Sequence, residues 1–179
     1  MITPPTEPGT VNVVVGTRHF LGPTWTHVDV DSSPLWDDAD DTWHPVDVVC
    51  DASQGIPLPD QYADLVFSSE ALEHFPRAIY QSVLAEWARL VKPGGLLRIE
   101  VPDFLQACQQ ILETDTLKMD RDIQCIFFAG QVNQYDFHYV GLTPRMLEED
   151  MMNLGLEVVS VERGNECGWL RVVGRRPLS

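Results

Sequence analysis

The hydrophobic positions of the chain fall into short runs that are separated by turn-forming residues. Five runs of four to six residues, rich in Val, Ile and Leu, lie at 12–15, 27–30, 46–50, 64–67 and 96–101. Continuous apolar runs of this length are typical of strands that are buried on both faces of a parallel sheet. The pattern therefore predicts five such strands.

Apolar residues at helical spacing predict three helices. The first has an apolar stripe over residues 79–91, with Pro76 in its opening turn and a KPGG stop signal after it. A second stripe covers residues 104–112. The third helix begins at the N-cap Thr143, which is followed by Pro144.

The last two apolar runs, 156–161 and 169–175, alternate with polar residues and are joined by residues 163–166. They predict an antiparallel hairpin. Alternating strands and helices predict an α/β fold with a mostly parallel sheet and ligands outside the carboxyl ends of its strands. We expect a single domain over residues 1–179, with a Pro-rich, loose arm at residues 1–10.

Composition and charge exclude several classes of protein. The chain is 44% hydrophobic, which excludes wholesale disorder, and no apolar run approaches the roughly 20 residues of a membrane span. Its 12 basic and 27 acidic residues give a net charge of −15, which argues against nucleic acid and anionic membranes as partners. The acid-rich stretch 31–45 reads as irregular.

The four cysteines, Cys50, Cys108, Cys125 and Cys167, form no C-x-x-C pair. We therefore expect neither metal knuckles nor disulfides, but buried or half-buried thiols in a reducing compartment. The first ten residues also lack a basic start and an apolar stretch, so we expect a cytoplasmic protein.

Candidate binding residues follow the first three strands. Gly16 permits a tight turn and the close approach of a ligand, although a lone glycine is also a common turn residue. Asp29 could accept both hydroxyls of a ribose or be a solvated acid. Asp51 could orient the exocyclic amine of a nucleobase or cap the turn that leads to Gly55.

The fourth strand and its surroundings carry an ordered set of motifs. IPLPD at residues 56–60 precedes DLVFSSEALEH at 64–74, and EWARLVKPGG at 86–95 precedes VPD at 101–103. This set resembles the class I S-adenosylmethionine-dependent methyltransferases, in particular a short branch with LEH, KPGG and VPD motifs. The resemblance extends over residues 11–161 and implies a Rossmann-like sandwich with S-adenosylmethionine as cofactor.

The resemblance also implies where the cofactor binds. It places Gly16 by the methionine part, Asp29 by the ribose, and Asp51 by the adenine. The serines before Glu70 would then line the floor beside the sulfonium. The cofactor-binding residues it implies are Val15, Gly16, Thr17, Asp29, Val30, Asp51, Ala52, Ser68 and Ser69.

Two departures from the family pattern weaken this expectation. Val14 stands where the family has a glycine, and its side chain is expected to push the backbone and the cofactor apart. Only about a dozen residues separate Gly16 from Asp29, and residues 19–23 break any helix there, so the first crossover helix should be reduced to a loop.

Three side chains are candidates for catalysis. Glu70 could accept a proton from a hydroxyl or be a solvated acid, and His74 could touch the substrate or only pack. His138 lies in an aromatic segment of a cap-like insert over residues 106–142, whose rings could stack on an acceptor or form the core of the cap. Glu73 should point toward a neighbouring turn or helix. The spacing of these groups predicts no metal.

The resulting expectation is a methyltransferase that acts on an oxygen or nitrogen of a small-molecule or glycan-type acceptor. The alternative is a methyltransferase-like fold with a weakened cofactor site that serves as a binding or partner subunit. A nicotinamide-binding protein is disfavoured because G-x-G-x-x-G is absent. The expected partner is a small, hydroxylated, sugar-type molecule, with neither nucleic acid nor membrane, and a homodimer is compatible with these features.

Overall fold

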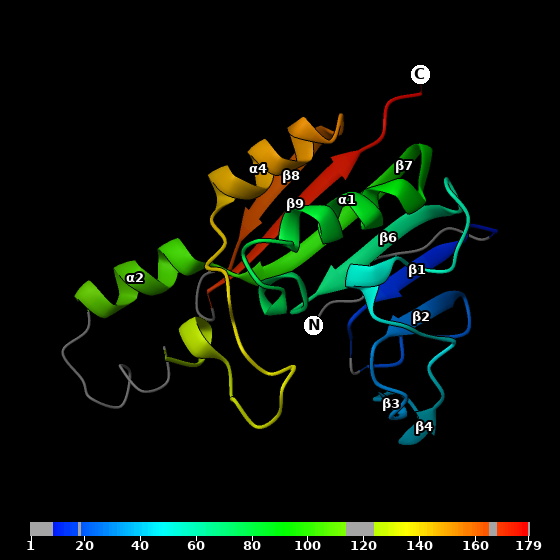
Figure 1. Ribbon diagram of the computed structural model, residues 1–179, viewed down its shortest axis with the longest axis horizontal. Helices are drawn as coiled ribbons and strands as arrows, with labels where there is room; N and C mark the ends of the chain where they lie inside the picture. The colour runs from blue at the N-terminus through cyan, green and yellow to red at the C-terminus, as the bar shows by residue number, and fades with distance from the viewer. Residues whose placement is uncertain (1–8, 18, 114–123, 165–167, 179) are drawn as a thin grey trace.

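The structure is a computed structural model that describes residues 9–17, 19–113, 124–164 and 168–178. Seven strands form one sheet in the order β5-β2-β1-β6-β7-β9-β8, in which β9 runs antiparallel to both of its neighbours (Figure 1). The strands are β1 (Asn12–Val15), β2 (Trp25–Asp29), β5 (Val48–Val49), β6 (Ala63–Ser69), β7 (Val91–Pro102), β8 (Glu157–Arg163) and β9 (Trp169–Arg175).

The order of the strands reverses between β1 and β6. From β1 the chain adds β2 and β5 on one side, and it then returns to add β6 and β7 on the other side. Parallel strands in this arrangement leave a crevice beyond their carboxyl ends at the point of reversal, and ligands bind there. Gly16, Asp29 and Glu70 all stand at this edge of the sheet. The predicted α/β fold, with its mostly parallel sheet and its terminal antiparallel hairpin, is confirmed.

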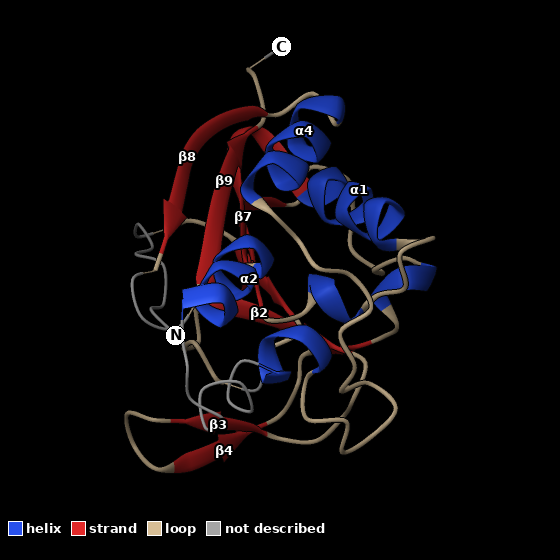
Figure 2. Ribbon diagram, turned by 90° about the vertical axis from the view of Figure 1, so that its left-hand side faces the viewer, coloured by secondary structure: helices blue, strands red, loops and turns tan. Residues whose placement is uncertain are grey.

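Two helices, α1 (Tyr80–Leu90) and α4 (Pro144–Asn153), cover the same face of the sheet (Figures 1 and 2). Their apolar stripes pack with the strands into the main hydrophobic core, because residues three and four apart on a helix share a face. Fully buried members of this core include Leu84, Trp87, Leu97, Ile99, Leu147 and Met151. A further helix, α2 (Phe104–Glu113), follows β7 and has only Ala107 buried.

The opposite face of the sheet has a smaller apolar cluster, formed by Val14, Trp25, Leu65 and Phe67. Beside it, Arg98 and Arg171 both donate hydrogen bonds to Glu100, and Arg98 lies over the Phe67 ring. Residues 16–17 and 19–24, which connect β1 to β2, contain no helix. The predicted loss of the first crossover helix is thus confirmed for these described residues.

The irregular stretch expected at 31–45 contains a short antiparallel hairpin, formed by β3 (Leu35–Asp37) and β4 (Thr42–His44). Trp36 lies opposite Trp43, with the rings edge to face at 5.0 Å. Strands of three residues are too short to show a period, so this expectation was wrong because the pairing, and not the local pattern, makes the hairpin.

The capping signals were confirmed at one helix and displaced at another. Thr143 accepts a hydrogen bond from the N–H of Met146, and Pro144 opens α4 as predicted. Pro76 instead lies in the turn before α1, where its carbonyl accepts hydrogen bonds from the N–H groups of Ile79 and Tyr80. The KPGG segment forms an irregularity at the start of β7, between the pairs Ala63↔Val91 and Leu65↔Leu96.

The remaining expectations concern the chain ends and the cysteines. The hairpin of β8 and β9 pairs as predicted, but part of its connection and residues 1–8 of the arm lie outside the described residues. Cys50 and Cys108 are half-buried, whereas Cys125 is exposed, contrary to expectation, because the helical turn at 124–128 lies at the surface. Cys167 lies outside the described residues. In the part of the chain that is described, no helix has the length and apolar character to cross a membrane.

Candidate functional site

A cavity of about 630 Å³ opens at the carboxyl ends of the strands, where the strand order reverses. This volume lies within the range of small-molecule and cofactor sites. Its wall comes from residues that follow β1, β2, β5 and β6 and from a segment before α4. The lining residues are Val15, Gly16, Val28, Asp29, Val30, Asp31, Cys50, Asp51, Ala52, Ser53, Glu70, Ala71, His74, Phe75, Val132, Asn133, Gln134, Tyr135 and Asp136.

Gly16 brings the turn after β1 against the turn after β6. Its N–H donates to the carbonyl of Val28 at 2.9 Å, and its φ of +69° lies in the left-handed region. A Cβ atom at this position would lie 2.6 Å from the Cβ of Ala71, so a larger residue would not fit without movement. The absence of a side chain therefore keeps this part of the cavity open.

Val14 does not narrow the cavity. Its side chain is fully buried on the opposite face of the sheet, against Trp25, Leu65 and Phe67. The expectation that Val14 would separate the backbone from a cofactor was wrong, because successive side chains of a strand point to opposite faces. Val15, the next residue, is the one that reaches the cavity.

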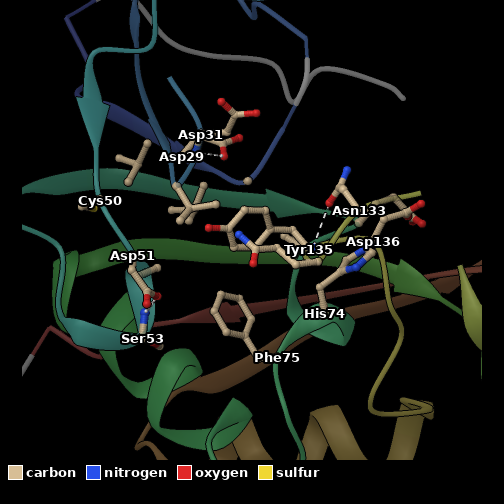
Figure 3. Close-up of a pocket in the computed structure, with 18 of the residues that line it drawn as sticks. Asp29, Asp31, Cys50, Asp51, Ser53, His74, Phe75, Asn133, Tyr135 and Asp136 are labelled. Carbon is tan, nitrogen blue, oxygen red and sulfur yellow. Dashed lines mark hydrogen bonds between the residues drawn. The ribbon is translucent and has the colours of Figure 1, made fainter. Parts of the chain in front are cut away.

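Acidic residues line one side of the cavity, as Figure 3 shows for Asp29, Asp31 and Asp51. A carboxylate oxygen of Asp29 accepts the N–H of Asp31 at 3.1 Å, and this bond fixes the turn after β2. Burial raises the pKa of the Cys50 thiol, and the nearby carboxylates, Asp51 first among them, raise it further. This side of the cavity therefore favours positive charge in a ligand.

Asp51 combines the two roles that the sequence left open. Its Oδ1 accepts the N–H of Ser53 at 2.9 Å and caps the 3-10 helix Ala52–Gln54, which ends at Gly55. Asp51 and Ala52 also line the cavity. Capping holds the carboxylate at the rim of the cavity because one of its oxygens is fixed to the backbone.

Glu70 and Ala71 line the cavity where β6 ends. Glu70 has a φ of +54°, an uncommon conformation for a residue with a side chain, and its N–H donates to the carbonyl of Glu100 at 2.9 Å. Burial of its carboxyl group, together with the neighbouring charge of Glu100, raises the pKa of Glu70 to about 7. Glu70 can therefore exchange a proton near neutral pH.

Three of the residues implied for cofactor binding lie outside this lining. Ser68 and Ser69 are 0% and 4% exposed within β6, so the residues beyond the end of the strand form the wall instead of the serines. Thr17 is also buried, and its hydroxyl accepts the N–H of His19. The six that line the cavity are Val15, Gly16, Asp29, Val30, Asp51 and Ala52.

The side of the cavity opposite the acidic turns is formed by His74 and Phe75 and by residues 132–136 (Figure 3). A carboxylate oxygen of Asp136 accepts the N–H of Val132 at 3.1 Å, and Asn133 accepts the N–H of Tyr135 at 2.8 Å. Tyr135 is half-exposed at 51%. These bonds hold a polar and aromatic wall over the cavity.

His138 lies behind this wall and contacts His74 edge to face, with ring centroids 4.7 Å apart. Glu73 is buried and points toward His138, at 3.8 Å from its Nε2, and not toward a turn or helix of its own neighbourhood as expected. Burial lowers the pKa of His74, and the adjacent His138 lowers it further. Burial and the Glu70 carboxylate hold the pKa of Glu73 well above its usual range.

Several lining residues were missed in the sequence. Phe75 directly follows the LEH motif and Cys50 directly precedes Asp51, so their proximity to candidates was a usable signal. Residues 132–136 carried no such signal, because they reach the cavity only when the segment before α4 folds back over the sheet. The aromatic residues of the insert divide between packing and lining: Phe127 contacts Phe104, whereas Tyr135 lines the cavity.

The sequence matches the methyltransferase domain family over residues 10–99, which is half of the chain. The chain therefore belongs to this family. It is an S-adenosylmethionine-dependent methyltransferase, and S-adenosylmethionine is its cofactor. No curated protein matches the chain in sequence.

Solved structures share the fold at low sequence identity. A Methanosarcina mazei S-adenosylmethionine-dependent methyltransferase has a TM-score of 0.62 at 14% identity, over 97% of this chain and 95% of that one. A Haloferax volcanii putative methyltransferase, solved with the activator Trm112, gives 0.61 at 19% identity, over 97% and 85%. The Burkholderia thailandensis 1,6-didemethyltoxoflavin-N1-methyltransferase, with bound S-adenosylhomocysteine, gives 0.57 at 16% identity, over 93% and 71%.

The cavity fits an adenosyl cofactor. It has the volume for one, Gly16 leaves its floor open, and acidic groups gather where a cationic sulfonium compound would lie. The carboxylate at the end of β2, Asp29, suits hydroxyl donors such as those of a ribose.

Proposed function

We propose that the chain methylates an oxygen or nitrogen of a small, hydroxylated, sugar-type acceptor that enters beside residues 132–136. The observation that carries this proposal is that a single cavity joins two chemically different walls. Acidic turns after β2 and β5 form one wall, and Glu70, His74 and the aromatic segment form the other. One wall suits the cofactor, and the other suits an acceptor.

The acidic wall would hold the cofactor. Asp29 would accept the ribose hydroxyls, Val15 and Gly16 would lie along the methionine part, and Ala52 would contact the adenine. Bound there, S-adenosylmethionine supplies a methyl group on a cationic sulfonium. Of the two observations that favoured a weakened site, the position of Val14 no longer does, since its side chain lies on the opposite face.

The other wall would choose and orient the acceptor. Tyr135 offers an exposed ring on which the apolar face of a sugar can stack, and the Asn133 and Asp136 side chains offer polar groups for its hydroxyls. Glu70 would accept the proton that the acceptor hydroxyl loses. Holding the acceptor in line with the methyl group supplies the remaining rate enhancement by proximity.

Ligand binding by the purified chain tests the cofactor half of this proposal. We expect S-adenosylhomocysteine to raise the melting temperature and to bind in calorimetry, since ligands that bind only the folded state stabilise it. Asp29→Ala should weaken the affinity at least about tenfold, equivalent to about 1.4 kcal/mol. Asp38→Ala removes an equal charge from an exposed residue outside the cavity and should leave the affinity unchanged.

An absence of any response to millimolar S-adenosylhomocysteine in the unsubstituted chain would instead favour the partner-subunit alternative. Release of S-adenosylhomocysteine in the presence of sugars, phenols and amines tests the acceptor half. We expect turnover with hydroxylated sugars, and a loss of about 10²- to 10⁴-fold in kcat in Glu70→Gln with the cofactor affinity retained. Turnover only with amines or phenols would refute a sugar-type acceptor.

A further inference from the structure

The Glu73 carboxylate stands in an environment that does not match its charge. The residue is 2% exposed, and neither carboxylate oxygen has a hydrogen-bond partner in the described part of the chain. An unpaired carboxylate in the protein interior costs several kcal/mol, so such groups are protonated, paired or bound to a cation. The surroundings of Glu73 decide among these.

Two imidazole rings face this carboxylate. Nδ1 of His138 lies 2.9 Å from the backbone carbonyl of Ile126, to which it donates when the ring is neutral. This bond leaves the lone pair on Nε2, which lies 3.8 Å from Oε1 of Glu73. The ring of His74 is in edge-to-face contact with that of His138, and its buried Nδ1 has no hydrogen-bond partner among the described residues.

The fold brings these three side chains together from two segments. Glu73 and His74 belong to the 3-10 helix Leu72–His74, whereas His138 belongs to the segment before α4. The N–H of Tyr139 donates to the carbonyl of Glu73 at 2.9 Å and fixes the two segments to each other. One ligand atom from each of Glu73, His74 and His138 then lies within 4.8 Å of the others.

We propose that Glu73, His74 and His138 bind a divalent transition-metal ion of the zinc, cobalt or iron(II) class. Two imidazoles and one carboxylate are a ligand set typical of these ions in sites that keep open coordination positions. Ligand distances of about 2.0–2.2 Å place tetrahedral ligand atoms roughly 3.4 Å apart, so the three groups need to close by little more than 1 Å. The Ile126 carbonyl orients His138 as outer partners orient metal-bound histidines.

This site departs from the sequence-based expectation of no metal. That expectation rested on spacing along the chain, and His138 is far from Glu73 in sequence. Because His74 also lines the cavity, an open position of the ion would face the acceptor side. There the ion would bind an acceptor oxygen and lower its pKa, and the hydroxyl proton would pass to the Glu70 carboxylate. This role rests on the proposed methyl transfer, whereas binding of the ion does not.

The chain offers a matched control in a second cluster of potential ligands, Asp37, Asp40 and His44. This cluster lies on the β3–β4 hairpin, and its groups are already occupied within the hairpin. His44 Nε2 is 3.6 Å from a carboxylate oxygen of Asp37 and 3.0 Å from the hydroxyl of Thr42, which itself donates to Asp40. Substitution of His44 therefore removes a histidine without touching the proposed site.

The test is titration of the chelator-treated, full-length chain with Co²⁺, followed by visible absorption, and with Zn²⁺, followed by calorimetry. We expect one ion per chain, a cobalt spectrum typical of nitrogen and oxygen ligands, and a rise in melting temperature with Zn²⁺. Glu73→Gln and His138→Ala should each weaken binding at least about 100-fold, whereas His44→Ala should not change it. Circular dichroism identifies any variant that fails to fold.

If one variant does not fold, anomalous scattering from cobalt in crystals of the unsubstituted chain locates the ion directly. The proposal is overturned if neither ion binds, if His44→Ala abolishes binding, or if the ion lies elsewhere in the crystal. S-adenosylhomocysteine affinity, measured on the same metal-free sample, separates the two proposals. Its retention without metal binding would refute the metal site alone, and its loss with metal binding intact would refute the cofactor site alone.

Discussion

The two halves of the sheet on either side of the β1–β6 boundary are built differently. On one side, the long strand β7 and its neighbours β6 and β9 pack against α1 and α4. On the other side, β2 and the two-residue strand β5 are connected by loops and by the β3–β4 hairpin. Figure 1 shows both helices over the first half. Buried apolar area stabilises the first half, and the second half contributes much of the cavity wall.

Electrostatic contacts follow the same division. Arg89 on α1 forms ion pairs with Glu86 and Asp60 and donates to the carbonyls of Ile56 and Leu58, which ties the chain before β6 to the helix. The turns after β2 and β5 instead present acidic groups to the cavity. The molecule thus concentrates its stability in one half, and the other half can present charged groups because a rigid scaffold supports it.

The largest expected effect is on the core of the helix-covered half. Leu84 on α1 is fully buried, so Leu84→Ala should lower the free energy of unfolding by about 3–4 kcal/mol through lost burial and the cavity that remains. Val49 on β5 is 52% exposed, and Val49→Ala should change it by less than about 0.5 kcal/mol. Denaturant unfolding measures both. Equal effects would mean that the two halves are equally important for stability.

A smaller effect is expected from the strap that ties the chain before β6 to α1. Arg89→Met keeps much of the side-chain length but removes the hydrogen bonds to two carbonyls, and it should cost about 1–3 kcal/mol. Lys92→Met removes a single surface ion pair with Asp64 and should cost about 0–1 kcal/mol. The two unfolding curves compare them directly. A cost for Lys92→Met as large as that for Arg89→Met would contradict the role of the strap.

The smallest expected effect concerns pH. Because the folded-state pKa of Glu70 is raised from 4.5 to about 7, its stabilising contribution is complete below pH 4.5 and disappears as the pH rises through 7. Glu70→Gln should therefore match the unsubstituted chain at pH 4.5 and exceed it at pH 8 by up to about 1 kcal/mol, a value reduced for solvent access. Thermal unfolding with a chelator present measures this difference. A constant difference across this range would show that Glu70 does not titrate as proposed.

The sequence predicted the elements whose signals are local. Strands at 12–15 and 169–175 were placed at the observed bounds, Thr143 and Pro144 marked the start of α4, and the gap between Gly16 and Asp29 was too short for a helix. The same motifs predicted the family, which the match over residues 10–99 confirmed. These features depend on periodicity, capping and chain length, which neighbouring residues specify.

Tertiary structure decided which side chains meet. The phase of β1 turned Val14 to the far face, and the end of β6 left Ser68 inside the sheet while Glu70 reached the cavity. Folding of the segment before α4 onto the LEH motif placed His138 beside Glu73. A sequence pattern specifies the period of a strand or helix, but contacts between distant segments depend on packing, so only the folded chain determines the composition of the site.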